Sequence, residues 1–202
     1  MTASADRSGA GPSANAGGEH RLIVAGSGGQ GILTLGKLLC MAAMSDGKKA
    51  TYLPAYGPEV RGGTANCQVV ISPDVIYSPL VELADSLIIF NQLSYERFGG
   101  ALRDGGLMLV NSSGVDLGTE GERRCTALLA LPATELAAEM GDVRVANIIM
   151  LGAFVTIRKL VAEQSCLAAL SDLLGQRKAA LLQLNERAFA RGTELARHRP
   201  SA

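Results

Sequence analysis

A short apolar run that ends in a glycine-rich turn and continues into a helical pattern constrains the fold of this chain most strongly. The run is RLIVAG at residues 21–26, and the turn is GSGGQG at residues 26–31. Apolar residues then recur at helical spacing over residues 32–39, and the segment closes at Gly47. This order predicts strand, turn and helix, which is the first unit of an α/β domain.

Further apolar runs predict the rest of a sheet, and most are nearly continuous, as expected for strands covered on both faces. The predicted strands are 49–55, 66–72, 86–90, 106–110 and 125–130, and the predicted helices are 94–102, 133–140, 145–160, 165–175 and 177–198. The helix over 145–160 is apolar nearly all round, so we expect it to be buried. The pattern predicts a three-layer, open, mostly parallel α/β sheet with helices on both faces, extra C-terminal helices and ligand loops at the strand C-termini.

The last predicted helix carries an apolar stripe and a set of basic side chains. The stripe is formed by Leu181, Leu182, Ala188 and Phe189. We expect it to cover the core rather than to recruit a separate partner, and the basic side chains to be solvated.

Composition and charge set the class of protein. The chain has 202 residues, 48% of them hydrophobic, and its 19 basic residues balance 19 acidic ones. We expect a single domain over residues 20–200, after a disordered lead at 1–19 that is rich in Ala, Gly, Ser and Pro. The balanced charge and the absence of an apolar run of about 20 residues argue against nucleic-acid and membrane partners, and predict a soluble cytoplasmic protein.

Several chemistries are excluded by missing patterns. The four cysteines are far apart and form no CxxC pair, and only two histidines accompany them, so the sequence encodes neither a zinc site nor an iron–sulfur cluster. No nucleophile elbow, phosphate loop ending in GK[ST] or HExxH is present. We expect the cysteines to be small buried side chains, with Cys67 left open because it ends a motif described below; the residues are Cys40, Cys67, Cys125, Cys166, His20 and His198.

The glycine turn has three possible roles. Gly26, Gly28 and Gly31 satisfy the GxGxxG spacing, which can place a phosphate or carboxylate at a helix N-terminus. A dinucleotide site also expects an acidic residue at the end of the second strand, whereas Asp46 falls before that strand. A purely structural turn and a contact with an anion or a partner therefore remain beside the weaker dinucleotide hypothesis.

A second glycine-rich loop, YGPEVRGGTANC at residues 56–67, follows the second predicted strand. Its glycines and proline predict irregular backbone, and Arg61 lies beside two glycines that allow another group to come close to the main chain. Such a loop suits an anion or a partner surface. Alternatively, Glu59 and Arg61 neutralise each other at the surface.

Four ordered motifs carry a resemblance to a known family. They are GSGGQGILTLGKLL, LPAYGPEVRGGTANCQVVIS, SPLVELADSLIIFNQLSYERF and RVANIIMLGAF. Over about residues 21–160 the chain resembles the gamma subunit of the 2-oxoacid:ferredoxin oxidoreductases, most closely the 2-oxoglutarate and branched-chain types. The resemblance implies a complex that oxidatively decarboxylates a 2-oxo acid on thiamine diphosphate, transfers the acyl group to coenzyme A and reduces ferredoxin, with 2-oxoglutarate as the preferred substrate.

The resemblance also implies a division of labour between chains. Thiamine diphosphate, Mg and the iron–sulfur clusters belong to sibling chains, and this chain alone is expected to bind no cofactor or metal and to supply no catalytic residue. The implied partners are the alpha and beta thiamine-binding subunits and an iron–sulfur ferredoxin-like subunit or ferredoxin. Two alternatives stay open: a subunit of an indolepyruvate-type oxidoreductase, and a non-catalytic nucleotide-binding or assembly module.

The family's two loops match this sequence residue by residue and imply a surface for coenzyme A or another subunit. Arg61 would hold an anionic group, while Thr64, Asn66 and Gln30 would orient it by hydrogen bonds. Asn91 and Gln92 complete the family pattern after the fourth strand. The implied contact residues are Gly26, Ser27, Gly28, Gly29, Gln30, Gly31, Tyr56, Gly57, Pro58, Glu59, Arg61, Gly62, Gly63, Thr64 and Asn66.

Overall fold

The computed structural model describes residues 18–56, 64–117, 127–175 and 179–198, and within them six strands form one sheet. The sheet order is β2-β3-β1-β4-β5-β6. The strands are β1 (His20–Ser27), β2 (Lys49–Tyr56), β3 (Thr64–Ser72), β4 (Ala84–Ile89), β5 (Leu102–Asn111) and β6 (Ala127–Leu131). Each coincides with a predicted apolar run, so the predicted α/β class is confirmed.

The strands of the sheet run parallel to one another except for β3. The pairs β1–β4, β4–β5 and β5–β6 are parallel, whereas β3 runs antiparallel to both of its neighbours, β1 and β2. The mostly parallel sheet is therefore confirmed, with one reversed strand inside it. As a consequence, β3 begins at the edge of the sheet where the parallel strands end.

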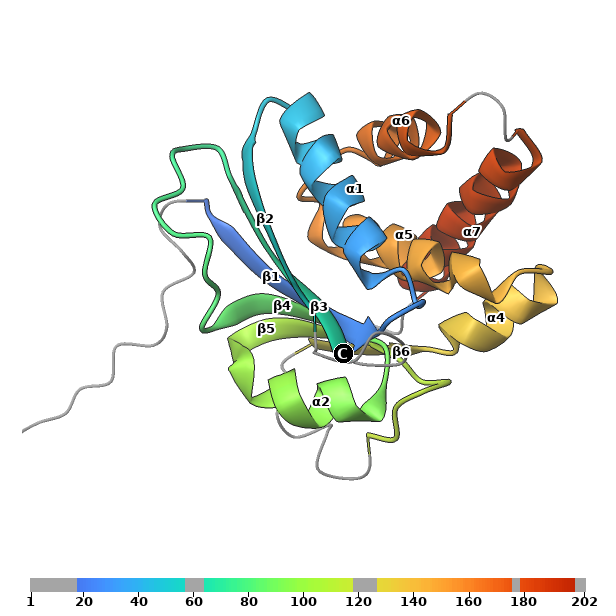
Figure 1. The fold of residues 1–202 in the computed structure, drawn as a ribbon, viewed down its shortest axis with the longest axis horizontal. Helices are drawn as coiled ribbons and strands as arrows, with labels where there is room; N and C mark the ends of the chain where they lie inside the picture. The colour runs from blue at the N-terminus through green and yellow to red at the C-terminus, as the bar shows by residue number, and fades with distance from the viewer. Residues whose placement is uncertain (1–17, 57–63, 118–126, 176–178, 199–202) are drawn as a thin grey trace, which may run out of the picture.

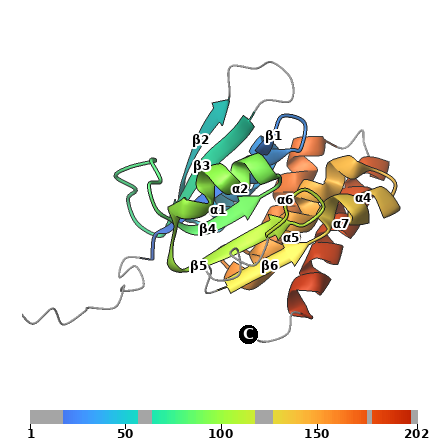
Figure 2. The same ribbon diagram turned by 90° about the horizontal axis from the view of Figure 1, so that it is seen from below.

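Helices cover the two faces of the sheet unequally (Figures 1 and 2). One face carries α1 and α5 with α6 and α7 beyond them, and the other face carries α2. The helices are α1 (Ile32–Ser45), α2 (Gln92–Phe98), α4 (Ala133–Glu139), α5 (Ala146–Arg158), α6 (Glu163–Leu174) and α7 (Ala179–Arg197), with short 3-10 turns η1 (Gly99–Ala101) and η2 (Val143–Val145).

The core is divided by the sheet according to strand alternation. On β1, Leu22 and Val24 belong to the larger cluster beneath α1 and α5, while Ile23 and Ala25 belong to a smaller cluster on the α2 side. The smaller cluster is completed by residues such as Val81 and Val115, which lie outside the strands and helices. The α2 face is therefore covered partly by irregular chain.

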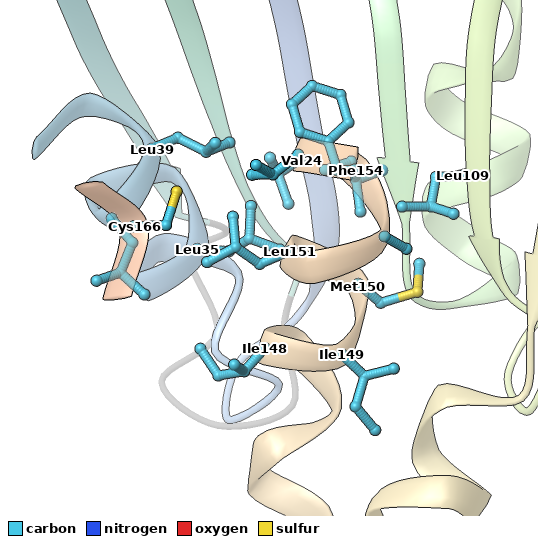
Figure 3. Packing of buried hydrophobic residues seen from close by; sticks show 14 of the residues in the cluster. Val24, Leu35, Leu39, Leu109, Ile148, Ile149, Met150, Leu151, Phe154 and Cys166 are labelled. Carbon is cyan, nitrogen blue, oxygen red and sulfur yellow. The ribbon is translucent and has the colours of Figure 1, made fainter. Parts of the chain in front are cut away.

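Helix α5 is the buried centre of the thicker side, as its continuous apolar pattern predicts. Residues 146–155 are all buried. In Figure 3, Leu151 of α5 and Leu35 of α1 point toward each other. Helices α5 and α7 cross in backbone contact, because a Cβ added at Gly192 would lie 1.9 Å from the carbonyl oxygen of Ile149 and one added at Gly152 would lie 2.2 Å from that of Phe189.

Two further sequence expectations are confirmed by burial. Ala188 and Phe189 of the α7 stripe are buried in the main cluster, so the last helix does cover the core. Cys40, Cys67 and Cys166 are buried free thiols, whereas Cys125 lies outside the described residues. Of the helices in the described ranges, none has both the length and the apolar character that crossing a membrane requires.

Helix α5 crosses the sheet from its carboxyl edge to its amino edge. The carboxyl edge is where β1, β4, β5 and β6 end and where α1 and α5 begin. The amino edge is where β1, β4 and β5 begin and α5 ends. In open α/β sheets ligands bind at the carboxyl edge, and the two glycine-rich motifs lead to that edge.

Candidate functional site

The glycine turn between β1 and α1 is held in shape by its own residues. Gly29 and Gly31 adopt left-handed backbone with φ of +94° and +72°. The side-chain oxygen Oε1 of Gln30 accepts a hydrogen bond from the backbone N–H of Ser27 at 2.7 Å. A Cβ at Gly26 would lie 2.6 Å from that same Oε1, so the turn closes only with glycine there. Gln30 thus uses its acceptor inside the turn.

The N-terminus of α1 points out of this turn at the carboxyl edge. Gly31 is the N-cap and no side chain caps the helix, whose first turn carries no acidic residue. The first N–H groups of a helix have no partner within it, and the helix dipole places partial positive charge there. A 14-residue helix that begins in this way offers donors to an anion.

Asn147, in the first turn of α5, reaches across to the glycine turn. Its Nδ2 donates to the carbonyl oxygen of Gly31 at 3.1 Å, and a Cβ at Gly31 would lie 2.3 Å from Nδ2. The side chain is 4% exposed, and its Oδ1 has no hydrogen-bond partner among the described residues. A buried acceptor without a partner is uncommon in folded proteins and points to a missing donor.

The sequence pattern predicted no role for Asn147, although this residue lies in the family motif RVANIIMLGAF. The available signal was its polarity, since it is the one amide among the ten consecutive buried residues of α5. Periodicity alone treats such a residue as a flaw in the apolar pattern. Its partner, Gly31, is 116 positions away in the chain, and only the fold brings the two together.

Asn91 ties the end of β4 to the end of β1. Its Nδ2 donates to the Ser27 hydroxyl at 2.5 Å, while its Oδ1 accepts from the Ser94 N–H at 2.9 Å and caps α2. The adjacent Gln92 accepts a hydrogen bond from the Asp116 N–H at 3.0 Å. The predicted Asn-Gln pair therefore lies at the carboxyl edge, where it braces neighbouring segments.

The second loop begins and ends beside the glycine turn. Thr64, the first residue of β3, pairs with Ser27 at the end of β1, and Tyr56 at the end of β2 pairs with Ala65. Asn66 pairs with Ala25 and is buried. The two motifs thus meet at one edge. The residues of the second loop that were predicted to contact coenzyme A or a sibling subunit, and that lie outside the described residues, are Gly57, Pro58, Glu59, Arg61, Gly62 and Gly63.

Cys67, the last residue of the second glycine-rich motif, is a packing residue. Its Sγ lies 3.6 Å from the carbonyl oxygen of Ile32, and a Cβ at Gly36 would lie 2.4 Å from Sγ. Burial raises the pKa of the Cys67 thiol to about 12. A protonated, fully buried thiol is a poor nucleophile and a poor metal ligand.

The described residues also bear on the metal and dinucleotide hypotheses. Within the described ranges, no three His, Cys, Asp or Glu side chains come together as a metal site would need. Asp46, the only acid near the spacing expected for a ribose contact, accepts hydrogen bonds from the Ala162 N–H at 2.7 Å and from the Ser165 hydroxyl. Its carboxylate is therefore engaged at the start of α6, which weakens the dinucleotide hypothesis.

Known proteins that are similar to this chain fall into two groups, which differ in how much of their own length the chain matches. The ketoisovalerate oxidoreductase subunit VorA of Methanothermobacter marburgensis is 42% identical over 139 residues, which are 69% of this chain and 28% of VorA. The 2-oxoglutarate synthase subunit KorC of Methanocaldococcus jannaschii is 35% identical over 176 residues, covering 86% of this chain and 92% of KorC. This chain therefore spans less than a third of VorA but nearly all of KorC.

Solved structures fall into the same two groups. The gamma subunit of a keto/oxoacid ferredoxin oxidoreductase from Geobacter sulfurreducens matches with a TM-score of 0.73 and 28% identity, over 89% of this chain and 99% of that one. A 2-oxoglutarate:ferredoxin oxidoreductase from Magnetococcus marinus, with 2-oxoglutarate, coenzyme A and succinyl-CoA bound, matches with a TM-score of 0.81 and 26% identity, over 91% of this chain and 32% of that one.

A family model agrees with these similarities. The model for pyruvate ferredoxin/flavodoxin oxidoreductase matches residues 21–195, which include the six described strands except for the first residue of β1, and nearly all of α7. With the match to KorC over most of both chains, this shows that the chain belongs to the pyruvate ferredoxin/flavodoxin oxidoreductase family.

Proposed function

We propose that this chain is the gamma-type subunit of a cytoplasmic, thiamine-diphosphate-dependent 2-oxoacid:ferredoxin oxidoreductase complex. The complex decarboxylates a 2-oxo acid, transfers the acyl group to coenzyme A and passes the electrons to ferredoxin. Family membership and the gamma subunit from Geobacter sulfurreducens support this role. Thiamine diphosphate, Mg and iron–sulfur clusters are assigned to the alpha, beta and ferredoxin-like partners, which supply the carbanion and redox chemistry.

In this proposal the carboxyl edge is the working surface of the chain. The observation that carries it is the unpaired Oδ1 of Asn147 beside the left-handed Gly31 and the uncapped start of α1. The helix start suits an anionic group, and Oδ1 suits a donor on the same ligand or partner. Coenzyme A carries both kinds of group, and it is bound in the structure of the related Magnetococcus marinus enzyme.

In the proposal, Arg61 adds a cation to this surface. Arg61 belongs to the loop between Tyr56 and Thr64, and these two residues both lie at the carboxyl edge. In the proposal its guanidinium pairs with an anionic group of coenzyme A, or with an acidic group of a sibling subunit, beside the donors of the glycine turn. The chain itself moves no proton and forms no covalent bond with substrate.

Two exposed apolar side chains support a sibling subunit close to the same edge. Leu93 follows Asn91 at the start of α2 and is 57% exposed, and Val143 in η2 precedes α5 and is 54% exposed. Exposed large apolar residues beside a polar site are typical of a surface that is covered in an assembly. Coenzyme A at the centre and a subunit around it are therefore compatible roles for the edge.

The 2-oxo acid is proposed from the relatives. The family resemblance favours 2-oxoglutarate, which agrees with the name of the 2-oxoglutarate synthase subunit KorC, while the name of VorA supports ketoisovalerate as the second candidate. Copurification from the native cell, followed by activity assays over a panel of 2-oxo acids, tests both assignments. Recovery of this chain without larger thiamine-binding chains would contradict the subunit role itself.

The experiment for the working surface is Arg61→Ala in the assembled complex. We expect a higher KM for coenzyme A with little change in the KM for the 2-oxo acid, or weaker assembly if the guanidinium contacts a sibling subunit. Arg187→Ala is the matched control, because Arg187 is exposed on α7, which does not form the edge. Unchanged kinetics and assembly in Arg61→Ala would remove Arg61 from the proposal.

A further inference from the structure

The segment between β3 and β4, residues 73–83, presents large apolar side chains to solvent. Val75, Tyr77, Leu80 and Leu83 are 62%, 93%, 57% and 54% exposed. They account for more than half of the exposed large apolar residues in the described part of the chain. The segment starts where β3 ends and leads into β4, which places it at the amino edge, opposite the glycine turn.

Hydrogen bonds and buried anchors fix the backbone of this segment. The Val81 N–H donates to Oε1 of Gln68 at 2.6 Å, and the carbonyl oxygen of Leu80 accepts from Nη1 of Arg21 at 3.1 Å. Val81 is buried in the smaller core cluster, and the partly buried Ile76 packs against this cluster. The exposed side chains are therefore carried on an anchored segment whose inward residues already fill the core.

The chemistry of the surface fits a protein partner. Apolar residues grouped on one segment mark interaction sites more often than single exposed residues do, and tyrosine is enriched in interface cores. Asp74 and Glu82 are exposed within the same segment and place acidic groups around the apolar ones. A complementary partner would present an apolar hollow with basic residues at its rim.

The two groups of relatives indicate which partner this is. KorC and the Geobacter gamma subunit are matched over 92% and 99% of their lengths, whereas VorA and the Magnetococcus chain are matched over 28% and 32%. In the longer proteins the same domain is continuous with about twice its own length of further polypeptide. A domain that occurs both fused and separate requires surfaces that hold this neighbour when no covalent link exists.

We propose that Val75, Tyr77, Leu80 and Leu83 form a docking surface for the sibling subunit that corresponds to this further polypeptide. The inference rests on the proposed function, in that it assumes the chain works in such a complex. It adds a second assembly contact, at the amino edge, to the one proposed around the coenzyme A surface at the carboxyl edge. The side chains act as apolar anchors, with Tyr77, the most exposed, at the centre of the contact.

The test uses the complete complex with Tyr77→Glu and, as a second variant without added charge, Tyr77→Ser. We expect the affinity of this chain for its sibling subunit to fall at least about tenfold in Tyr77→Glu and less in Tyr77→Ser. Met44→Glu is the matched control, since Met44 is 66% exposed on α1, outside the segment. Hydrogen exchange of residues 73–83 should slow when the complex assembles.

The outcomes separate this inference from the proposed function. Assembly at wild-type affinity in both Tyr77 variants, with unchanged exchange at 73–83, would overturn the docking surface and leave the subunit role intact. A dimer of the isolated chain that Tyr77→Glu converts to monomer, without any effect on the complex, would assign the surface to a second copy and also overturn it. If no sibling chain binds at all, both proposals fail.

Discussion

The two ends of α5 lie in polar surroundings that differ in one respect. At the amino edge, Nε of Arg158 donates to the Ser86 hydroxyl at 2.9 Å and its Nη2 donates to the Asp85 carbonyl oxygen at 2.7 Å. At the carboxyl edge, the Oδ1 of Asn147 is buried without a partner in the described structure. The same helix thus ends in a satisfied network and begins in an unsatisfied one.

The amino-edge network extends through further paired groups. The carboxylate of Asp85 forms a salt bridge with Arg103 at 2.7 Å and accepts a hydrogen bond from the Arg21 N–H at 2.7 Å. Nε2 of His20 lies 3.1 Å from the Ser86 hydroxyl, and Ser86 is fully buried. A serine that no substrate can reach is not a nucleophile, so this His–Ser pair is structural.

In the proposal, this difference separates a structural site from a functional one. Buried polar groups that satisfy one another stabilise and specify a fold, whereas a buried acceptor with no partner costs stability unless a ligand or partner completes it. Changes in the amino-edge network around Arg158, Ser86 and Asp85 should therefore lower stability and leave catalysis in the complex unchanged. Changes at the carboxyl edge should do the reverse.

The largest effect on stability is expected from Asp85→Ala. The substitution leaves the Arg103 guanidinium without its carboxylate and the Arg21 N–H without its acceptor, in a carboxylate that is only 15% exposed. The free energy of unfolding should fall by about 3 kcal/mol, because unpaired buried polar groups lose their compensation. Urea denaturation measures the change, and Asp104→Ala, at an exposed position one residue after Arg103, should stay within about 0.5 kcal/mol.

Activity measurements on the same variant test whether the amino edge has only a structural role. Complexes that contain Asp85→Ala should keep the wild-type KM for coenzyme A at a temperature where the variant is folded. A raised KM without lost stability would mean that the amino edge takes part in ligand binding, against the structural role assigned to it.

Acid should lower the free energy of unfolding by a somewhat smaller amount. The pKa of His20 is lowered to about 4, chiefly by burial; Asp85 opposes this shift, and Arg158 and Arg103 contribute to it. Between the ordinary pKa of about 6.5 and this value, the unfolded chain binds a proton that the folded chain does not. Stability should therefore fall as pH falls, by about 2 kcal/mol between pH 7 and pH 5.

The His20→Gln variant isolates this contribution. Its free energy of unfolding should depend less steeply on pH between 7 and 5 than that of the wild type, whereas His198→Gln, at the exposed end of the chain's last helix, should keep the wild-type slope. The comparison uses denaturation at several pH values. Equal slopes in all three proteins would show that folding does not lower the pKa of His20.

The smallest effect on stability, with the largest effect on function, is expected from Asn147→Ala. The variant loses the hydrogen bond to Gly31 but also removes the unpaired Oδ1, so the free energy of unfolding should fall by no more than about 1 kcal/mol. In the complex, the KM for coenzyme A should rise about tenfold, or assembly should weaken, because the glycine turn loses its brace and its acceptor.

Asn185→Ala provides the matched control for this variant. Asn185 is 7% exposed, and its Nδ2 donates to the carbonyl oxygen of Leu181 at 2.7 Å within α7. It therefore loses a similar hydrogen bond away from the carboxyl edge. We expect a similar loss of stability with unchanged kinetics, and equal kinetic defects in the two variants would show that Asn147 acts only through stability.

Sequence patterns predicted the elements well and their directions less well. Apolar runs such as 86–90 and the all-round apolar helix at 145–160 record burial directly, which is why their positions match β4 and α5. An apolar run carries no direction, so nothing in β3 signalled that it runs against its neighbours. Because β3 is reversed, Thr64 lies beside Ser27, and the two glycine-rich motifs meet at one edge of the sheet.

The candidate site was predicted only in part for a related reason. Glycine spacing identified the turn, since positive φ at Gly29 and Gly31 restricts these positions to residues that tolerate it. The contacts of Asn147 with Gly31 and of Arg158 with Ser86 join residues 116 and 72 positions apart, and periodicity holds no record of such pairs. The roles predicted for Arg61 and its neighbours stay predictions, since residues 57–63 lie outside the described structure.

Hydrogen exchange at the start of α1 tests most directly whether the carboxyl edge is the working surface. The amides of Ile32, Leu33 and Thr34 have no partner within the helix, so they should exchange rapidly in the isolated chain. In the assembled complex, we predict slower exchange of these amides, either on assembly or when coenzyme A is added. Equal exchange in the isolated chain, in the complex and in the complex with coenzyme A would contradict the central claim.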